Sequence, residues 1–324
     1  MNYKSMIINY CKDIGLDTVG FTKCRVFEEL KHYFEYRKSM SLINEFEEQD
    51  INKKINPFMY MKDGKTIISI AFPYLFNNDF QQQVGFSKYT QGRDYHVVVS
   101  EYLKKICSFI EKEMSGKAVY FVDSNSLPER YIAKLCGVGF IGKNNMIITE
   151  KYGSYAFLGE IITNISIEED EPIECKCEDC DLCQKSCPTG AIRKENNSNI
   201  CLSYISQKKE IDDEWFNKLK GRIFGCDTCQ GVCPFNKKPS FSNIEEFKPY
   251  DFMEVINLEE LANIDKRVFL NKYSKSSCGW RGKNVLQRNA LINIISMKNN
   301  INIKEINSPY VKNYYNRLLY HFKL

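Results

Sequence analysis

The sequence predicts an α/β protein, in the broader α+β sense, built from three parts. Residues 1–170 alternate between strand and helix patterns, residues 171–238 contain two runs of closely spaced cysteines, and residues 239–324 combine helical periodicity with positive charge. A chain of 324 residues is long for one domain, so two or three modules are expected. The hydrophobic content of 43% is enough for packed cores and excludes a disordered chain.

Strand and helix patterns alternate through the first part. Nearly continuous apolar runs at 66–72 and 118–122 predict buried strands, and two further strands are expected at 146–149 and 155–165. After Asp94, apolar residues at spacings of three and four predict a helix with Asp94 as its N-cap. Ser126 and Glu129 have the spacing of a capping box for a second helix, and Gly137 fits the far end of that helix.

Two cysteine runs about forty residues apart predict two iron–sulfur clusters. The first run has the spacing C-x2-C-x2-C-x3-C-P, which is typical of bacterial ferredoxins whose fourth cysteine binds the other cluster. The second run has Ile223 where its first cysteine would stand, and Cys201 can supply the missing thiolate. The resulting ligand sets for two 4Fe–4S clusters are Cys177, Cys180, Cys183 and Cys233 for one, and Cys187, Cys201, Cys226 and Cys229 for the other.

Structural zinc is the alternative, because paired C-x2-C motifs also fit a zinc site with four cysteine ligands. The third cysteine only three residues on, and the Cys-Pro pairs at the end of both runs, favour iron–sulfur. The six other cysteines show no pairing pattern, as expected of reduced cytosolic thiols, and Cys175 is a possible spare ligand where eight already suffice.

The chain shows no apolar run of secretory or membrane-spanning length. We therefore expect a cytoplasmic protein without a membrane partner, and nothing in the sequence demands a dimer, so we expect a monomer.

Positive charge is concentrated at one end. Residues 266–324 contain twelve lysines and arginines and a single acid, a net charge of +11, while the preceding residues carry −7. Aromatic residues interleave with this charge, and such a pattern favours a nucleic-acid partner. The alternative is a solvated helical surface over an aromatic core.

Asp123 is the best candidate for a catalytic acid. It ends a predicted strand just before a helix, where α/β sheets open their ligand crevices. The alternative is a loop carboxylate that binds local amides at 124–125. The glycine-rich segment 137–145 follows a helix, which disfavours a dinucleotide site and fits a large flat ligand better. His96 follows Asp94 as in the D-x-H-x-x-G signature of cobalamin proteins, but Val99 replaces the glycine, so His96 is a poor axial ligand.

Taken together, these residues resemble the epoxyqueuosine reductases. The resemblance extends over most of the chain, and the segments that carry it are 91–96, 122–124 with Glu129 and Arg130, 137–144, 153–154, both cysteine runs with 201–204, and Arg281 with 286–290. It implies a nitroreductase-like domain (1–170) that binds base-off cobalamin, a ferredoxin-like module (171–238) with both clusters, and a HEAT-like helical module (239–324) that binds tRNA.

The resemblance also implies an activity. The clusters would pass electrons to the corrin, and the resulting cob(I)alamin would reduce epoxyqueuosine to queuosine at the wobble position of a tRNA anticodon stem-loop, the last step of queuosine biosynthesis. An electron donor such as a flavodoxin or a ferredoxin would supply the clusters. Asp123 would protonate the departing oxygen, and burial against the corrin would raise its pKa as that role requires. Candidate contacts, by position, are Tyr95, Arg130, Lys143, Asn144 and Ser154 for cofactor or substrate, and Arg281, Lys283 and Arg288 for RNA.

Three rival interpretations stay open at this point. A corrinoid reductive dehalogenase shares the cofactor plan, although it has little reason for a +11 tail. A dicluster electron carrier would bind two clusters but no corrinoid, and would leave the α/β domain without a role. An RNA-binding module with structural zinc would contain zinc in place of about eight irons.

Overall fold

The computed structural model describes residues 2–76, 84–123, 126–193, 195–298 and 303–324. Its first part is built around a four-stranded sheet with the order β1-β2-β7-β4, in which every pairing is antiparallel. The strands are β1 (Val19–Lys23), β2 (Thr66–Pro73), β7 (Ala156–Thr163) and β4 (Ala118–Phe121).

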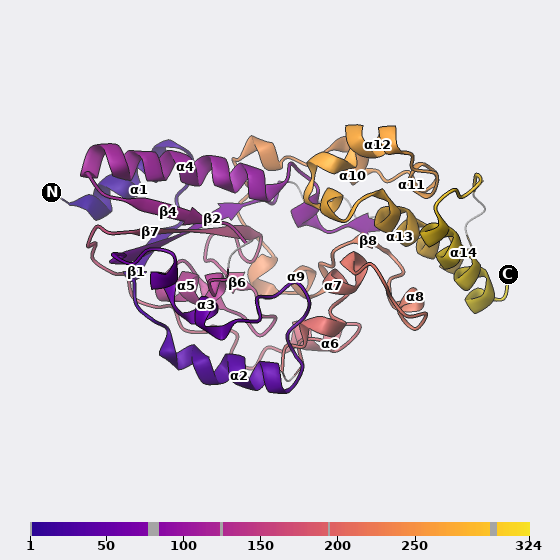
Figure 1. Ribbon diagram of the computed structural model, residues 1–324, viewed down its shortest axis with the longest axis horizontal. Coiled ribbons are helices and arrows are strands. Elements are labelled where there is room, and N and C mark those ends of the chain that lie inside the picture. Colours follow the sequence, from indigo (N-terminus) through magenta and orange to yellow (C-terminus); the bar gives the residue numbers. More distant parts are fainter. Residues whose placement is uncertain (1, 77–83, 124–125, 194, 299–302) are drawn as a thin grey trace.

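Helices cover both faces of this sheet, as Figure 1 shows. On one face lie α1 (Tyr3–Asp13) and α4 (Tyr95–Met114), and on the other lie α2 (Lys31–Ser39), α3 (Ile51–Ile55) and α5 (Glu129–Leu135). Strand β2 is buried along its whole length because alternate residues face the two helical layers: Ile68 packs toward α1 and α4, and Ile67 toward α5. The buried strand predicted at 66–72 is confirmed.

Of three local sequence signals in this domain, two predicted the structure correctly and one did not. Asp94 caps α4 as predicted, since its carboxylate accepts a hydrogen bond from the backbone N–H of His96 at 3.0 Å. Gly137 follows the end of α5 with a positive φ of 66°, also as predicted. The capping box is wrong: α5 begins after Pro128 without a side-chain cap, and the Ser126 hydroxyl lies instead 3.4 Å from a carboxylate oxygen of Glu48.

Two expectations about strand β4 are also wrong. It is an edge strand, with Val119 38% exposed, and not a buried one. Ligand crevices at strand ends are a feature of parallel sheets, whereas this sheet is antiparallel, so the reason given for placing Asp123 in a crevice does not hold. Asp123 nevertheless follows β4 directly.

The cysteine-rich part is made of short elements. A two-stranded parallel pairing joins β3 (Gly85–Phe86) to β8 (Arg222–Phe224), so a segment of the first part contributes to the second. A small hairpin, β5 (Phe140–Ile141) and β6 (Ile147–Ile148), lies between α5 and β7 in the chain. The helices of this part are α6 (Leu182–Ser186), α7 (Leu202–Gln207), α8 (Trp215–Lys218) and α9 (Thr228–Gly231).

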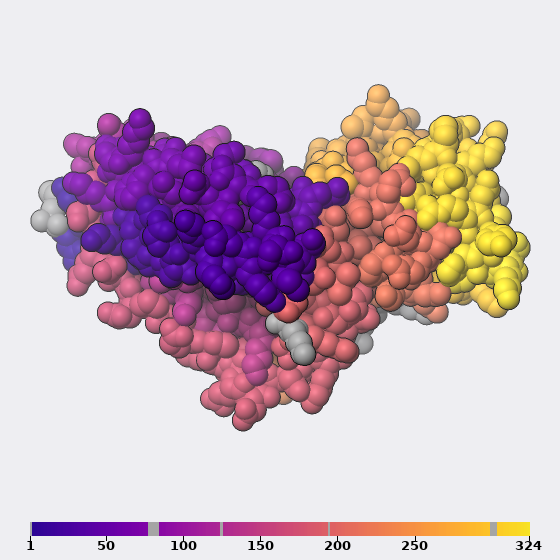
Figure 2. Space-filling model, turned by 60° about the horizontal axis from the view of Figure 1, so that its bottom comes forward, coloured from indigo at the N-terminus to yellow at the C-terminus, as the bar shows by residue number. Residues whose placement is uncertain are grey.

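The C-terminal part is helical. The helical periodicity predicted for residues 239–324 is confirmed by three short helices followed by two longer ones. The elements are α10 (Asp251–Glu254), α11 (Leu258–Ala262), α12 (Lys266–Asn271), α13 (Lys283–Ser296) and α14 (Pro309–Phe322). Helix α13 is buried on all sides, and its apolar side chains share one core with α7, α8, β8 and α14. Figure 2 shows this end of the molecule opposite the N-terminal domain, with the cysteine-rich part between them. None of the helices that the structure describes has the length and apolar character needed to cross a bilayer.

Candidate active site

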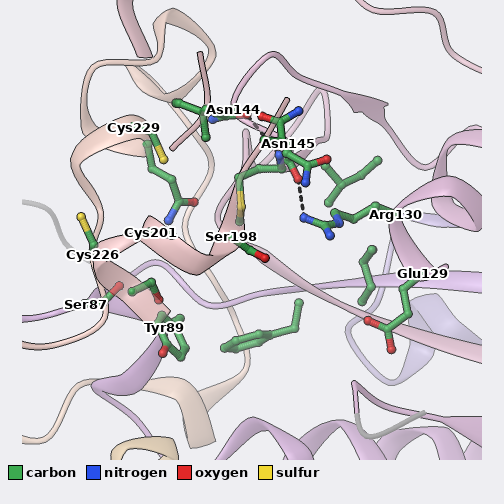
Figure 3. Close-up of a pocket in the computed structure, with 18 of the residues that line it drawn as sticks. Ser87, Tyr89, Glu129, Arg130, Asn144, Asn145, Ser198, Cys201, Cys226 and Cys229 are labelled. Carbon is green, nitrogen blue, oxygen red and sulfur yellow. Dashed lines mark hydrogen bonds between the residues drawn. The ribbon is translucent and has the colours of Figure 1, made fainter. Parts of the chain in front are cut away.

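A cavity of about 460 Å³ lies between the sheet domain and the cysteine-rich part. The sheet domain lines it with Tyr95, Asp123 and Phe157, and the cysteine-rich part lines it with three thiols. In Figure 3 these cysteines lie across the cavity from Glu129 and Arg130; they are Cys201, Cys226 and Cys229. Thiols that can hold a cluster therefore face the candidate acid across one space.

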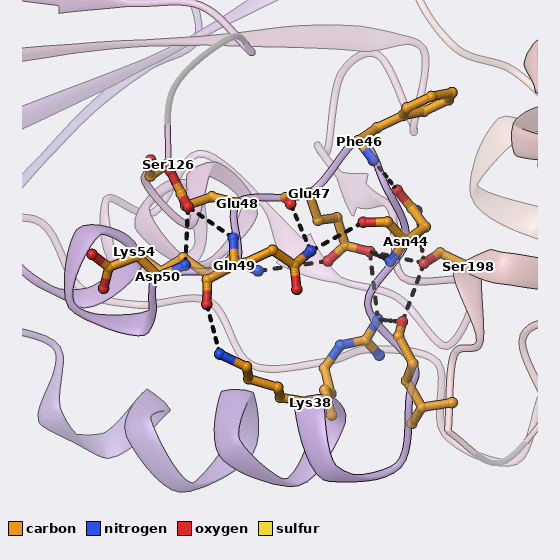
Figure 4. A network of polar contacts seen from close by, with 12 residues as sticks. Lys38, Asn44, Phe46, Glu47, Glu48, Gln49, Asp50, Lys54, Ser126 and Ser198 are labelled. Atoms are coloured by element: carbon orange, nitrogen blue, oxygen red, sulfur yellow. Dashed lines mark hydrogen bonds and ion pairs between the residues drawn. The ribbon is translucent and has the colours of Figure 1, made fainter.

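A second cavity of about 580 Å³ adjoins the first. The two share lining residues, among them Asp123, Glu129 and Arg130, which therefore lie at their junction. Figure 4 shows polar contacts in the wall of the second cavity, where Asn44 donates to the Ser198 hydroxyl at 2.9 Å. This contact ties the segment after α2 to the cysteine-rich part, so both cavities are enclosed by the same two parts of the chain.

Asp123 is held by its neighbours on α4. Its Oδ2 atom accepts a hydrogen bond from the Tyr95 hydroxyl at 2.5 Å and lies 3.2 Å from Nε2 of His96. The other ring nitrogen of His96, Nδ1, lies 2.8 Å from Oδ1 of Asp94. Tyr95 in turn stacks on Phe157 with ring centroids 4.3 Å apart. The imidazole is thus placed between two carboxylates at the start of a helix.

These contacts decide where a proton resides. The surrounding protein alone would raise the pKa of Asp123 by removing water, but hydrogen bonds from His96 and Tyr95 bring it below its ordinary value. Burial alone would lower the pKa of His96, but hydrogen bonds to Asp123 and Asp94 raise it to about 9. Within the protein itself, burial therefore does not keep Asp123 protonated; a rise in its pKa caused by burial against a corrin stays a prediction. At neutral pH the proton is on His96, next to an ionised Asp123.

His96, which contacts the candidate acid, is not among the site residues that the sequence predicts. The sequence pattern points to His96 only as a cobalt ligand, and Val99 in place of the glycine disfavours that role. The signal that could have found it is its place at the first turn of α4, beside Tyr95. The alternative for Asp123, hydrogen bonds to amides at 124–125, falls outside the described residues.

The structure brings the first predicted ligand set together. These four cysteines line one small cavity whose other walls include Ile148 and Phe235; they are Cys177, Cys180, Cys183 and Cys233. In the second set, Cys187 lies close enough to Cys201 and Cys229 for their charges to interact. Both sets thus consist of soft thiol donors in largely apolar surroundings, which fits iron–sulfur clusters.

The predicted cofactor contacts divide into two groups. Tyr95, Arg130 and Asn144 line the main cavity. Arg130 donates to the carbonyl of Asn145 at 2.6 Å, and the Nδ2 atom of buried Asn144 has no acceptor among the described residues. Asn144 also lines the first cysteine cavity, so it lies between that cavity and the main one.

Lys143 and Ser154 lie elsewhere. Lys143 lines the first cysteine cavity and donates to the carbonyl of Glu178 at 2.5 Å. Ser154 is fully buried and bonds Gln230 and Asn236 at 2.8 Å each. It joins the sheet domain to the cysteine-rich part, and a direct contact between Ser154 and a cofactor is not supported.

The basic residues predicted to contact RNA have different surroundings. Arg288 is fully buried and donates to the carbonyls of Ser206, Lys208 and Lys209, so the prediction that it touches RNA is wrong. Arg281 donates to the carbonyl of Gln207 and is half-buried. Lys283, at the start of α13, is also half-buried. The RNA roles of Arg281 and Lys283 stay predictions.

The fold and the site define a class: an iron–sulfur oxidoreductase in which an α/β domain and a two-cluster module enclose one cavity. A family model described as a 4Fe-4S double cluster binding domain matches residues 176–236, which favours iron–sulfur over zinc. A second, described as epoxyqueuosine reductase QueG, DUF1730, matches residues 54–124.

Known relatives identify the family. Epoxyqueuosine reductase of Bacillus anthracis is 38% identical over 306 residues, which is 91% of this chain and 80% of the relative. The enzyme of Bacillus subtilis is 36% identical over 91% of this chain and 79% of its own length. The chain belongs to the epoxyqueuosine reductase family and is an oxidoreductase.

Solved structures agree. A crystal structure of epoxyqueuosine reductase with an epoxyqueuosine-modified tRNA-Tyr stem loop has a TM-score of 0.93 at 33% identity, covering 98% of this chain and 90% of that one. In a structure of the Bacillus subtilis enzyme, a catalytic loop named for an aspartate is swung out of the active site; its TM-score is 0.91 at 33% identity, with the same coverage.

Proposed function

We propose that this chain reduces epoxyqueuosine to queuosine in tRNA, with two 4Fe–4S clusters as the electron path and a cobalamin in the cavity beside Asp123. The observation that carries the proposal is the cavity itself, because three cysteines of the second set and Asp123 line one space, and His96 contacts Asp123. The family membership and the match to the tRNA-bound relative support the same activity.

The cavity has the features that a corrinoid requires. It is open and largely apolar, it continues into the second cavity, and Asn144 offers an unpaired buried N–H group at its edge. Tyr95, Arg130 and Asn144 would hold the cofactor or the substrate. When bound, a reduced cobalamin would supply the electrons for the reduction and the nucleophile that attacks an epoxide carbon.

The residues of the chain would manage protons. Converting the epoxide to an alkene takes two electrons and two protons, and the oxygen leaves as water. His96 carries a proton at neutral pH and hands it through Asp123 toward the departing oxygen, while Tyr95 keeps Asp123 oriented. The pair then takes the second proton from water in the cavity. We infer that Asp123 corresponds to the catalytic aspartate of the Bacillus subtilis relative.

A surface for RNA adjoins the cavity. Phe46 lines the second cavity and is 40% exposed, and Trp280 is 52% exposed with its ring centroid 5.2 Å from that of Phe46. Arg281 lies over both rings. Exposed aromatic faces beside a cation can stack unpaired anticodon bases, so we propose this group as the contact that brings the modified base to the cavity.

The test is anaerobic reconstitution with iron, sulfide and cobalamin, followed by mass analysis of nucleosides from treated tRNA. The expected result is loss of epoxyqueuosine and an equal gain of queuosine. No conversion at full loading of both cofactors would contradict the proposal and favour the electron carrier. Loading of both clusters without any corrinoid binding would do the same.

A further inference from the structure

Glu160 is a buried acid that the proposed chemistry does not use. It lies in the middle of β7 and is completely buried. Its Oε1 atom lies 3.3 Å from the hydroxyl of Ser69 on the neighbouring strand β2. Within the described residues no donor reaches its Oε2 atom. A carboxylate in such a place is costly, so the group must be neutral or have a further role.

The neighbour of Glu160 is another acid. The carboxyl groups of Glu160 and Glu129 interact directly, and burial together with the charge of Glu129 raises the pKa of Glu160 well above its ordinary value. Among the described residues, the other titratable groups that interact with Glu160 include Asp123 and the thiol of Cys136, just after α5, and neither of these two brings a positive charge. Because its raised pKa keeps Glu160 protonated at neutral pH, its carboxyl group can donate a hydrogen bond to Glu129.

Glu129 connects this proton to the active site. Its Oε1 atom accepts a hydrogen bond from the backbone N–H of Asp123 at 2.7 Å. Asp123 has a φ of 45°, in the left-handed region that residues with a side chain seldom occupy, so this conformation needs support from its surroundings. The bond from Glu129 supports the backbone of Asp123, while Tyr95 and His96 contact its side chain.

We propose that Glu160 is a positioning residue that acts through Glu129 to hold Asp123 in its place beside His96. Without a donor at 160, Glu129 turns away from the backbone of Asp123, and the carboxylate leaves the imidazole. This inference rests on the proposed role of Asp123. It extends that role, because it names the residue that keeps the backbone at Asp123 in the position from which the side chain can act. In the Bacillus subtilis relative the corresponding loop has been seen swung out.

The test measures the position of Asp123 without relying on turnover. The chain has only three histidines, so selective ¹³C labelling gives three ring signals, and a His96→Gln variant identifies the one that matters. In the wild-type protein, with both clusters intact and oxidised, His96 should titrate near pH 9. In Glu160→Leu its pKa should fall by at least one unit, a tenfold change in the proton equilibrium, with Asp94 still retaining part of the shift.

The matched control is Glu160→Gln, which is also neutral but can still donate an N–H group to Glu129. Its His96 titration should stay near that of the wild type. Single-turnover reduction of epoxyqueuosine-containing tRNA should slow in the leucine variant with little change in KM, because binding groups are untouched.

Three outcomes would overturn the inference: an unshifted His96 in Glu160→Leu, an equally large shift in the glutamine variant, or a normal titration in Glu129→Ala. The last variant changes a half-buried residue at the start of α5, and it decides the question if the leucine variant does not fold. A shifted titration together with unchanged turnover would support the positioning role of Glu160 and contradict the role of Asp123 instead.

Discussion

The Nε2 atom of His96 lies 3.2 Å from the Oδ2 atom of Asp123, and the opposite ring nitrogen lies 2.8 Å from Asp94. A cation between two carboxylates keeps its proton to higher pH than a free imidazole. The pair can therefore hold a proton at neutral pH although Asp123 itself is ionised, and its proton-donating form is lost only when His96 is deprotonated.

This arrangement predicts the pH dependence of the reaction. Single-turnover rates should be level through neutral pH and fall as pH rises through about 9, the pKa of His96. A His96→Gln variant should be slower by about 100-fold or more, within the usual range for general acid catalysis, and should lose the limb near pH 9. The control is His321→Gln on α14, whose ring contacts Asn217. A wild-type alkaline limb that persists in His96→Gln would contradict the assignment.

The same pair predicts how stability changes with pH. Because folding raises the pKa of His96, its stabilising effect is fully present below its unfolded pKa of about 6.5 and is lost as pH rises through about 9. The Tm of the wild type should therefore exceed that of His96→Gln at pH 6 by a margin that shrinks steadily toward pH 9.5. Thermal unfolding at several pH values gives the comparison. A margin that grows with pH would show that His96 is not stabilised as a cation.

Iron content tests the ligand assignment. Cys201 stands outside both runs, and its thiol lies close to those of Cys226 and Cys187. Cys201→Ser should lower iron from about eight to about four atoms per chain, because one of two four-iron clusters loses a ligand. Cys175→Ser is the control, since Cys175 is exposed and eight other thiols suffice. A variant at Cys175 that loses as much iron as the one at Cys201 would require a different ligand set.

Sequence patterns predicted the structural features that depend on residues close together in the chain. The spacing of the cysteines and the cap at Asp94 are local features; the structure confirms the cap and gathers the first four cysteines around one cavity. The prediction of a capping box was wrong because the Ser126 hydroxyl contacts Glu48, a residue far away in the chain. His96 and Asp123 are 27 residues apart, and only the packing of α4 against the sheet brings them together. No local pattern contains that contact.

Arg288 shows the same limit in the helical part. The positive charge of Arg288 suggested a contact with RNA. In the structure its guanidinium group instead donates to three backbone carbonyls inside the protein, those of residues 206, 208 and 209. Arg288→Met should lower the free energy of unfolding by roughly 3–5 kcal/mol, because several buried acceptors lose their donor. Urea unfolding measures this. Arg267→Met, at an exposed position on α12, is the matched control and should change stability by less than about 0.5 kcal/mol.

Trp280 is the best single residue for testing the RNA surface. Its indole is 52% exposed, and it lies against Phe46 at the edge of the second cavity. Trp280→Ala should weaken binding of an anticodon stem-loop by roughly 5- to 150-fold, the range that one lost base-stacking contact gives. Fluorescence anisotropy with a labelled stem-loop measures the Kd. Tyr320→Ala is the control, because Tyr320 is 88% exposed on α14, away from the cavities. If both variants weaken binding equally, the contact is spread along the basic tail and is not focused at the cavity. If neither does, the proposed surface is wrong.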